Sequence, residues 1–409
     1  MDKTTNFFDV LHNNNHSGVA FKNIQLKKRI LIQFANEGNS TLADLSKELN
    51  ISIPKTNDLV NELLAEGIAK DYGKTEAGVG RKPNLYGLAP DSAFFVGVEV
   101  KNFHINIGLM DFRRNLVKST FGIPYLLNNN EVSLESLCSI INEFIKSSGI
   151  RREKILGIGV NLGGRINYLT GYSYSYFNFH EDPLSRIIEA ALGIHTFLEN
   201  DSRAMAYGEF CSGVVKDEKN VLFVNLDHGI GMGIMVNGQL YYGKSGFAGE
   251  LGHIPAFANE IICHCGKKGC LETEASGQAL VRIFRERIAH GETSTVTKIK
   301  EHTEDITLED IIHAANNDDT LAIELITEAG EKIGKGMATL VNLFNPELII
   351  LGGALAATGD YIRLPIKNAL YKYSLSLVNN DSQMIISKLG RKAGVIGACL
   401  LVRDRLLAL

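Results

Sequence analysis

Apolar residues recur at helical spacing in three short stretches near the N-terminus, over residues 24–34, 42–49 and 54–66. A break at 37–39 separates the first two stretches, and a turn around residues 50–52 separates the last two. The pattern therefore predicts three consecutive helices. The residues placed to cap the second and third helices are Ser40 or Thr41, and Ser52.

Two short runs typical of β-strands, residues 68–72 and 84–88, follow the third helix and are separated by several glycines. The order helix, helix, turn, helix, hairpin is typical of a winged helix-turn-helix. A helical protein-interaction module and a plain extension of the following domain are the two alternatives that the pattern leaves open. Residues 1–21 have little periodicity and are expected to form a flexible tail.

Polar side chains at the third helix and in the hairpin favour DNA binding over those alternatives. Residues 22–88 carry a net charge of +2, against −5 for residues 89–409. Gly80 to Pro83 should be extended, because a residue before proline avoids the helical region, and Arg81 there can enter a minor groove. The residues that we expect to contact bases or phosphates are Lys55, Thr56, Asn57 and Asn61 on the exposed face of the helix, and Arg81 and Lys82 in the wing.

After residue 93 strands and helices alternate, which predicts an α/β fold with two lobes. We expect a first lobe over 89–205, rejoined by a C-terminal helix at 394–409, and a second lobe over 206–393. The segment 172–180 alternates aromatic and polar residues, and it is either a half-exposed strand or a loop that stacks on a ligand. The expected strands are 94–100, 104–110, 155–160, 221–226 and 348–351, and the expected helices include 134–145, 182–191 and 333–344.

Composition limits the classes of function. The 409 residues include 42 basic and 46 acidic side chains, so the net charge is −4 and any nucleic-acid binding must be local. A run of 18 apolar residues is absent, and the N-terminus lacks the pattern of a signal peptide, so we expect a cytoplasmic protein without membrane insertion.

Three of the six cysteines lie within eight residues and follow a histidine by a short interval. Thiolates and an imidazole at this density are typical of a structural zinc site with four protein ligands, and Gly266 and Gly269 allow the chain to wrap around the ion. Three unrelated buried thiols are the alternative. His264 should point away if both of its neighbours bind the metal. The expected ligands are His253, Cys263, Cys265 and Cys270.

The segment Gly249-Glu250-Leu251-Gly252-His253, followed by Cys-x-Cys-Gly-x-x-Gly-Cys-x-Glu, resembles the ROK family of bacterial repressors, open reading frames and sugar kinases. The resemblance extends over the chain past residue 22, and the winged helix points to the repressor branch. It implies two actin-like or hexokinase-like lobes of the ribonuclease H-like fold, with a sugar cleft between them.

The same resemblance implies the residues that contact the sugar. Asn200 and Asp201 match the family's Glu-Asn-Asp segment, in which the Asp is the catalytic base of the kinases. A polyol needs several carboxylate and amide groups on a rigid rim, and the metal loop would make the rim rigid. The full set of expected sugar-binding residues is Gly164, Asn200, Asp201, Glu250, His253 and Glu272.

Both phosphate loops of the family's kinases are altered here. The Asp-x-Gly-Gly-Thr turn reads Glu99-Val100-Lys101-Asn102-Phe103, which removes the glycines that let amides approach phosphates. The second loop, Gly-Thr-Gly-x-Gly, begins with Asp227, whose carboxylate would repel a triphosphate. The turn Gly352-Gly353, which flanks adenosine in kinases, is retained. We therefore predict that the protein is not an enzyme, with no catalytic residue.

The resulting expectation is a sugar-responsive transcriptional regulator, in the commoner mode a repressor, of genes for carbohydrate uptake or catabolism. Its expected partners are an operator in double-stranded DNA, a sugar or sugar phosphate as effector, and further copies in a homodimer or dimer of dimers. A glucokinase-like, ATP-dependent sugar kinase with an added DNA-binding domain is the alternative. A protein partner in place of the sugar is a third reading.

Overall fold

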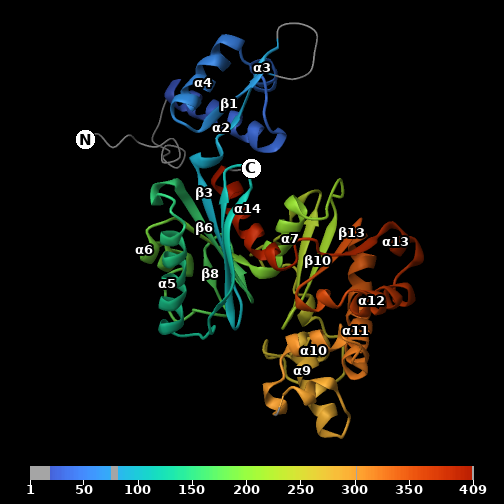
Figure 1. Cartoon of the computed structure of the whole chain (residues 1–409). Coiled ribbons are helices and arrows are strands. Elements are labelled where there is room, and N and C mark those ends of the chain that lie inside the picture. Colours follow the sequence, from blue (N-terminus) through green and yellow to red (C-terminus); the bar gives the residue numbers. More distant parts are fainter. Residues whose placement is uncertain (1–18, 75–81, 301, 408–409) are drawn as a thin grey trace. The chain divides into compact units, whose positions relative to one another are not determined.

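The computed structural model describes residues 19–74, 82–300 and 302–407, which form two compact units (Figure 1). The first unit comprises Met1–Val160, Ser185–Phe197 and Ala398–Leu409. The second comprises Asn161–Leu184 and Leu198–Gly397. None of the helices in the described part of the chain is long and apolar enough to cross a membrane.

Residues 19–74 and 82–88, the described N-terminal part of the first unit, contain three helices and a β-hairpin. Thr41 caps α3 in a capping box with Asp44, and Ser52 caps α4, in agreement with the expected caps. The sequence therefore predicted the helices and the hairpin correctly. The elements are α2 (Val19–Glu37), α3 (Leu42–Leu49), α4 (Ile53–Ala65), β1 (Ala69–Lys74) and β2 (Asn84–Leu88), and the two strands pair antiparallel.

The rest of the first unit is built on a five-stranded sheet with the order β5-β4-β3-β6-β9. Strand β3 (Phe94–Val100) is buried along its whole length and pairs antiparallel with β4 (His104–Asp111), and both strands were expected from the sequence. The last residues of β6 and β9 belong to the second unit. The remaining elements are β5 (Leu116–Pro124), α5 (Glu131–Ser147), β6 (Ile155–Leu162), α6 (Leu184–Leu192), β9 (Thr196–Asn200) and α14 (Ala393–Leu407).

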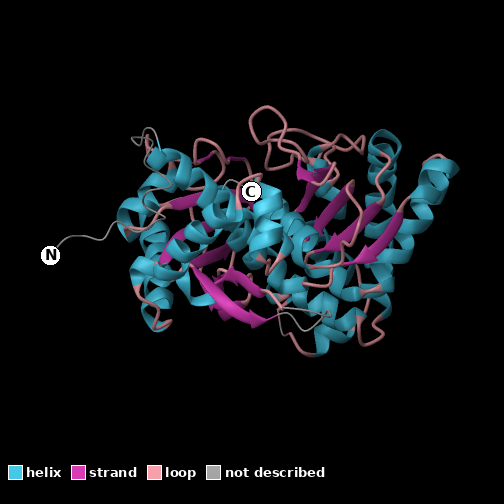
Figure 2. Cartoon of the chain, turned by 90° about the horizontal axis from the view of Figure 1, so that it is seen from above, coloured by secondary structure: helices cyan, strands magenta, loops and turns pink. Residues whose placement is uncertain are grey.

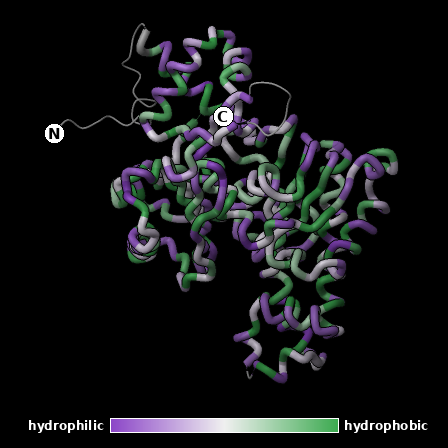
Figure 3. The backbone as a smooth tube through the Cα atoms, turned by 45° about the horizontal axis from the view of Figure 1, so that its top comes forward, coloured by the Kyte–Doolittle hydropathy of each residue, from purple (hydrophilic) through white to green (hydrophobic). Residues whose placement is uncertain are grey.

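The second unit is built on a sheet with the order β12-β11-β10-β13-β14. Its central strands β10 (Val221–Leu226) and β13 (Leu348–Gly352) pair in parallel and are buried throughout, which explains why Asn225 is the only polar side chain in them. Hydrophobic and hydrophilic stretches alternate along the rest of the chain (Figure 3). The other strands are β7 (Ile166–Asn167), β8 (Tyr172–Ser173), β11 (Ile230–Val236), β12 (Gln239–Leu240) and β14 (Gln383–Ile386).

Helices flank this second sheet (Figure 2), and the two longest, α11 and α12, pack against each other. Helix α11 (Thr320–Phe344) begins well before the predicted residue 333 because Asp319 caps it at its N-terminus. The other helices are α7 (Asp201–Ser212), α8 (Glu272–Ala275), α9 (Gly277–Ala289), α10 (Leu308–Ala315), α12 (Asp360–Tyr373) and α13 (Ser376–Asp381).

The segment 172–180 is mainly a loop. Only Tyr172 and Ser173 pair as a strand, with Ile166–Asn167, and the residues that follow form turns. Phe177 adopts a positive φ of 55°, which is incompatible with a continuing strand. The strand alternative is therefore wrong for most of this segment.

Candidate metal centre and adjoining polar site

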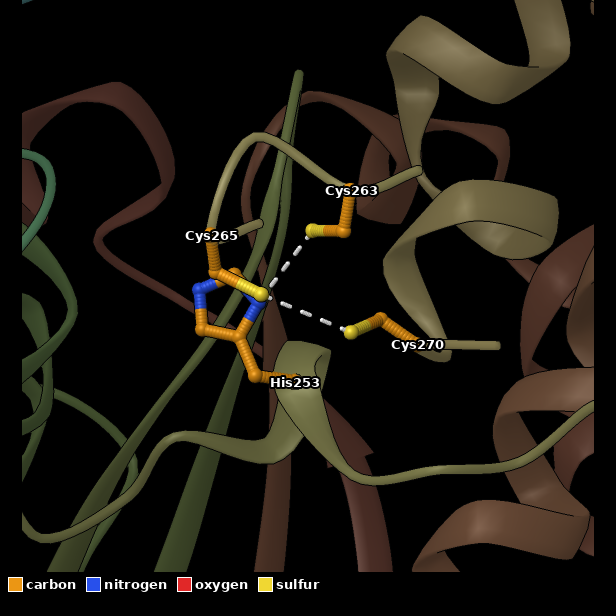
Figure 4. Close-up of side chains that lie close together, drawn as sticks. All are labelled: His253, Cys263, Cys265 and Cys270. Carbon is orange, nitrogen blue, oxygen red and sulfur yellow. Dashed lines mark hydrogen bonds between the residues drawn. The ribbon is translucent and has the colours of Figure 1, made fainter. Parts of the chain in front are cut away.

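One histidine and three cysteines converge in the second unit (Figure 4). The Cys263 sulfur lies 3.5 Å from Nδ1 of His253, and the sulfurs of Cys265 and Cys270 are 3.6 Å apart. In a tetrahedral site with arms of about 2.0–2.3 Å, neighbouring ligand atoms lie about 3.5–3.8 Å apart. The four ligand atoms, all within 4.8 Å of one another, thus fit a single metal ion.

The loop that carries the cysteines is closed by its own backbone. The amide of Cys263 donates to the carbonyl of Lys267 over 2.8 Å, and the amide of Gly266 donates to the carbonyl of Cys263 over 2.8 Å. Gly269 has a φ of 73°, and a Cβ there would lie 2.1 Å from the carbonyl oxygen of Phe257. A side chain at this position would therefore prevent the close return of the chain that brings Cys270 to the cluster.

Protonation of two of the three thiols, those of Cys263 and Cys270, opposes metal binding in this cluster. Burial is the main cause that raises the pKa of Cys270, to about 12, and burial also raises the pKa of Cys263. A bound cation requires thiolates, so it must displace these protons, and its affinity should rise with pH.

His264 lies closer to the cluster than the sequence suggested. Its Nδ1 is 3.8 Å from the Cys263 sulfur and 3.5 Å from a carboxylate oxygen of Glu272. The ring of His264 thus does not point away from the cluster, as the sequence suggested, but approaches Glu272. It is still outside the group of four ligands, and 63% of its side chain is exposed.

The start of helix α7 brings three of the expected sugar-binding residues together. Asn200 caps the helix by accepting from the amide of Arg203 over 3.1 Å, and its Nδ2 donates to the carbonyl of Gly164 over 3.0 Å. Gly164 has a φ of 89°, and a Cβ there would lie 2.3 Å from Oγ of Ser175. One amide side chain therefore joins the glycine turn to the helix end that carries Asp201.

Two glutamates lie beside the histidine of the metal cluster. Oε2 of Glu250 lies 3.8 Å from Nε2 of His253, and Oε2 of Glu272 lies 3.9 Å from Nδ1 of the same ring. His253 thus stands between both carboxylates and the thiols. All six expected sugar-binding residues belong to the second unit.

The pKa values of two glutamates of the site, Glu250 and Glu272, are raised. Burial is the largest cause that raises the pKa of Glu272, to about 7, and the charges of Glu250 and Asp201 raise it further. The pKa of Glu250 is also raised, first by burial, while Arg203 and Arg165 oppose this shift. The arrangement concentrates hydrogen-bonding oxygens in a partly dry site, which suits a ligand rich in hydroxyl groups.

Two further residues lie at this site that the sequence did not single out. Arg165 follows Gly164 directly, and its charge contributes to lowering the pKa of His253, which burial lowers most. Tyr176 is half-buried, and its pKa is raised mainly by burial and then by the charges of Asp201 and Glu272. Their position next to the glycine turn and in the aromatic segment was the only available signal.

Comparison with known proteins identifies the family. Residues 95–405 match the ROK family, and residues 25–70 match a family described as winged helix-turn-helix DNA-binding. The chain belongs to the ROK family. The resemblance inferred from the zinc-type motif and the N-terminal helices is thus confirmed, together with the winged helix.

Relatives of this ROK protein include both repressors and kinases. The xylose repressor of Caldicellulosiruptor bescii is 28% identical over 368 residues, which cover 89% of this chain and 92% of the repressor. A glucokinase of Halalkalibacterium halodurans is 34% identical over 316 residues, which cover 76% of this chain and 96% of the glucokinase. A solved ROK family transcriptional regulator, a homologue of the E. coli Mlc protein, is 28% identical with a TM-score of 0.78, covering 95% of this chain and 98% of its own.

Residues 101–103 of this ROK protein form a tight turn between β3 and β4. The amide of Lys101 donates to the carbonyl of His104 over 2.9 Å, and Phe103 is 61% exposed. The carboxylate of Glu99 is buried and is engaged by Nδ2 of Asn106 at 2.7 Å and by Nζ of Lys101 at 3.3 Å. Glu99 thus has partners within its own sheet.

Residues 227–229 connect β10 and β11 and lie against the N-terminus of helix α9. The amide of Gly277 donates to the carbonyl of Asp227 over 2.9 Å, and that of Gln278 donates to the carbonyl of His228 over 3.0 Å. The next amide, of Ala279, donates to Oγ of the capping Ser276. The amides that a helix N-terminus offers to a phosphate are therefore engaged by acceptors of the chain itself.

The expected DNA-contacting residues differ in exposure. Asn61 and Lys82 are exposed, and Lys55 and Asn57 are partly exposed. Thr56 is fully buried, and its hydroxyl donates to the carbonyl of Ser52 over 3.1 Å. Placing Thr56 on the exposed face was therefore wrong, because it shares the buried stripe of α4 with Leu59, Val60 and Leu63. Arg81 lies outside the described residues.

Proposed function

We propose that this chain is a DNA-binding transcriptional repressor of carbohydrate uptake or catabolism genes, and that a bound sugar changes its affinity for the operator. The observation that carries this proposal is the extent of the matches. The relative named as a xylose repressor matches 89% of the chain, whereas the glucokinase matches 76%, and a winged helix-turn-helix precedes the ROK region. Such a protein acts on DNA in the cytoplasm.

The proposed effector is a sugar or a sugar phosphate held by the polar site of the second unit. Carboxylates at Asp201, Glu250 and Glu272 can accept hydrogen bonds from hydroxyl groups. The amide of Asn200 can both donate and accept such bonds. Gly164 allows the close approach of Ser175 to the turn, which a side chain at this position would prevent. His253 would take part both in this site and in the metal cluster, which joins the sugar rim to a rigid loop.

The proposed metal is a structural zinc ion bound by His253, Cys263, Cys265 and Cys270. Three thiolates and one imidazole form a donor set that suits zinc, and four protein ligands leave no open position for catalysis. Zinc would supply a crosslink between the turn that carries His253 and the cysteine loop.

The proposed DNA-binding surface comprises α4 and the wing. Lys55, Asn57 and Asn61 would contact base edges and phosphates, and Arg81 and Lys82 would contact the adjacent groove. Because one winged helix binds DNA weakly, we propose a homodimer or a dimer of dimers that reads paired half-sites.

A selection experiment with the full-length protein tests the function. Duplexes that bind are selected from a random pool, and their affinity is then measured by fluorescence anisotropy with D-xylose, D-glucose, N-acetyl-D-glucosamine and the corresponding phosphates. We expect one of these ligands to weaken DNA binding by about 5- to 150-fold, which corresponds to a coupling of ~1–3 kcal/mol. Mannitol at the same concentration serves as the control.

Each failure in this experiment has a different meaning. If no duplex is enriched above the level of non-specific binding, the DNA-binding role is contradicted. Specific DNA binding that no sugar alters would contradict the sugar response and favour a protein partner as the signal.

The main alternative, an ATP-dependent sugar kinase, is disfavoured by both altered phosphate loops. Internal partners engage Glu99 in the first loop, and the carbonyls of Asp227 and His228 engage the α9 amides in the second. We expect no ADP release above background with Mg-ATP and glucose, N-acetylglucosamine or xylose, measured in a coupled assay. Sustained turnover that the Asp201→Asn variant abolishes would establish the kinase instead.

A further inference from the structure

A fully buried arginine lies next to the proposed sugar site. Arg203 is only 2% exposed, and it belongs to the first turn of α7, two residues after Asp201. Burying a guanidinium costs several kcal/mol unless it is paired and its donors are engaged. The contacts of this side chain must therefore offset a large desolvation penalty.

The guanidinium of Arg203 binds three different segments of the second unit. Its Nε donates to Oε1 of Glu199 over 2.7 Å, its Nη1 donates to the carbonyl of Gly246 over 2.6 Å, and its Nη2 donates to the carbonyl of Ile166 over 3.2 Å. None of the three acceptors lies on α7 itself. Glu199 belongs to β9, Ile166 to β7, and Gly246 to a turn. One planar group thus connects segments that are far apart in sequence.

Tyrosine rings complete the surroundings of this ion pair. The hydroxyl of Tyr242 donates to Oε2 of Glu199 over 3.2 Å, and the guanidinium lies 5.7 Å from the centre of the Tyr242 ring. Tyr168 stacks on that ring with a centroid distance of 3.7 Å. Oε1 of Glu199 also accepts from the amide of Asn200 over 2.8 Å, so the buried pair reaches the helix cap directly.

Each segment that Arg203 holds carries a residue of the proposed sugar site. Ile166 follows Gly164 by two residues, Glu199 directly precedes Asn200 and Asp201, and Gly246 precedes Glu250 by four residues. We propose that Arg203, paired with Glu199, is a positioning residue that holds these three segments in the arrangement that binds the sugar. This inference rests on the proposed function of the site.

The physical reason is preorganisation. A ligand that must order three loops loses affinity to their conformational entropy, whereas segments already fixed impose no such cost. Arginine suits this task because its planar fork offers donors in several fixed directions, which a lysine ammonium cannot reproduce. An apolar side chain of similar volume could fill the space, but it would leave the carbonyls of Ile166 and Gly246 without this donor.

The test separates positioning from stability with a pair of variants. Arg203→Met removes the donors and leaves Glu199 as an uncompensated buried charge, so both stability and sugar affinity should fall. The double variant Glu199→Gln/Arg203→Met has no stranded charge, so its melting temperature should recover toward the wild-type value. Its affinity for the sugar should stay about 10- to 100-fold weaker, measured by calorimetric titration with D-xylose and D-glucose.

Arg403→Lys is the matched control, because Arg403 is also buried, at 1% exposure, but lies in the first unit. It should leave sugar affinity unchanged. Recovery of sugar affinity together with stability in the double variant would show that Arg203 has only a structural role and would overturn the inference.

Hydrogen exchange of the ligand-free protein tests the positioning role of Arg203 without any sugar. Amides in segments 164–168 and 242–250 should exchange faster in the double variant than in the wild type, while those of the Arg403→Lys protein should not change there. Unchanged exchange in both segments would overturn the positioning role. Failure of the wild-type protein to bind any sugar would instead contradict the proposed function.

Discussion

Replacing Cys270 by serine is expected to reduce bound zinc from about one ion per chain to almost none and to destabilise the second unit. Cys270 is buried, and its sulfur lies 3.6 Å from that of Cys265, so a bound ion would join the cysteine loop to the turn of His253. Loss of a structural metal removes several kcal/mol of stability, and a domain of this size loses ~2–4 °C per kcal/mol. We therefore expect a fall of about 10 °C in melting temperature.

Cys211→Ser is the matched control for this prediction, because Cys211 is a partly buried thiol of the same unit outside the cluster. Zinc is measured by mass spectrometry of the dialysed protein, and stability by calorimetry with and without a chelator. Full zinc content in the Cys270→Ser protein, or a chelator that leaves the wild-type melting curve unchanged, would contradict a structural zinc site.

Replacing Asp201 by alanine is expected to weaken sugar binding by about 100-fold or more. Hydrogen bonds to a charged group contribute ~1.5–3 kcal/mol, and each tenfold in affinity corresponds to ~1.4 kcal/mol. Asp201 lies at the first turn of α7, where its carboxylate accepts from the amide of Ser202 at 2.7 Å and from Asn225 at 3.3 Å. These contacts fix its orientation toward a ligand.

Binding of DNA by the Asp201→Ala protein should be retained but should no longer respond to the sugar. Asp217→Ala, at an exposed turn of the same unit, is the control and should behave as the wild type. Calorimetric titration with the sugar that releases DNA gives the affinity, and anisotropy gives the DNA response. Equal sugar affinity in the two variants would remove Asp201 from the proposed site.

Local physics explains why so much of the fold could be predicted from sequence. The caps at Thr41 and Ser52 and the mainly apolar strand 221–226 depend on residues close in the chain, and the structure has them as expected. The cysteine loop was predictable for the same reason, because three of the four clustered residues lie within eight residues of the chain and converge in the structure.

Burial, by contrast, depends on contacts that the sequence pattern does not name. Thr56 looked like a polar surface residue, but the stripe of α4 that packs inward includes it. The segment 172–180 alternated like a strand, yet it pairs over two residues only, because its partner β7 is equally short. In both cases a tertiary neighbour overrode a valid local preference.

The sequence alone determined the order of the elements, the family and the set of polar residues available for a metal and a sugar. Only the tertiary structure decided that Glu272 and His264 approach each other and that Arg203 is buried among Glu199, Ile166 and Gly246. The reason is that a charged residue on a helix is normally solvated. Its burial becomes favourable only when distant segments supply acceptors in the right directions, and no local pattern records that convergence.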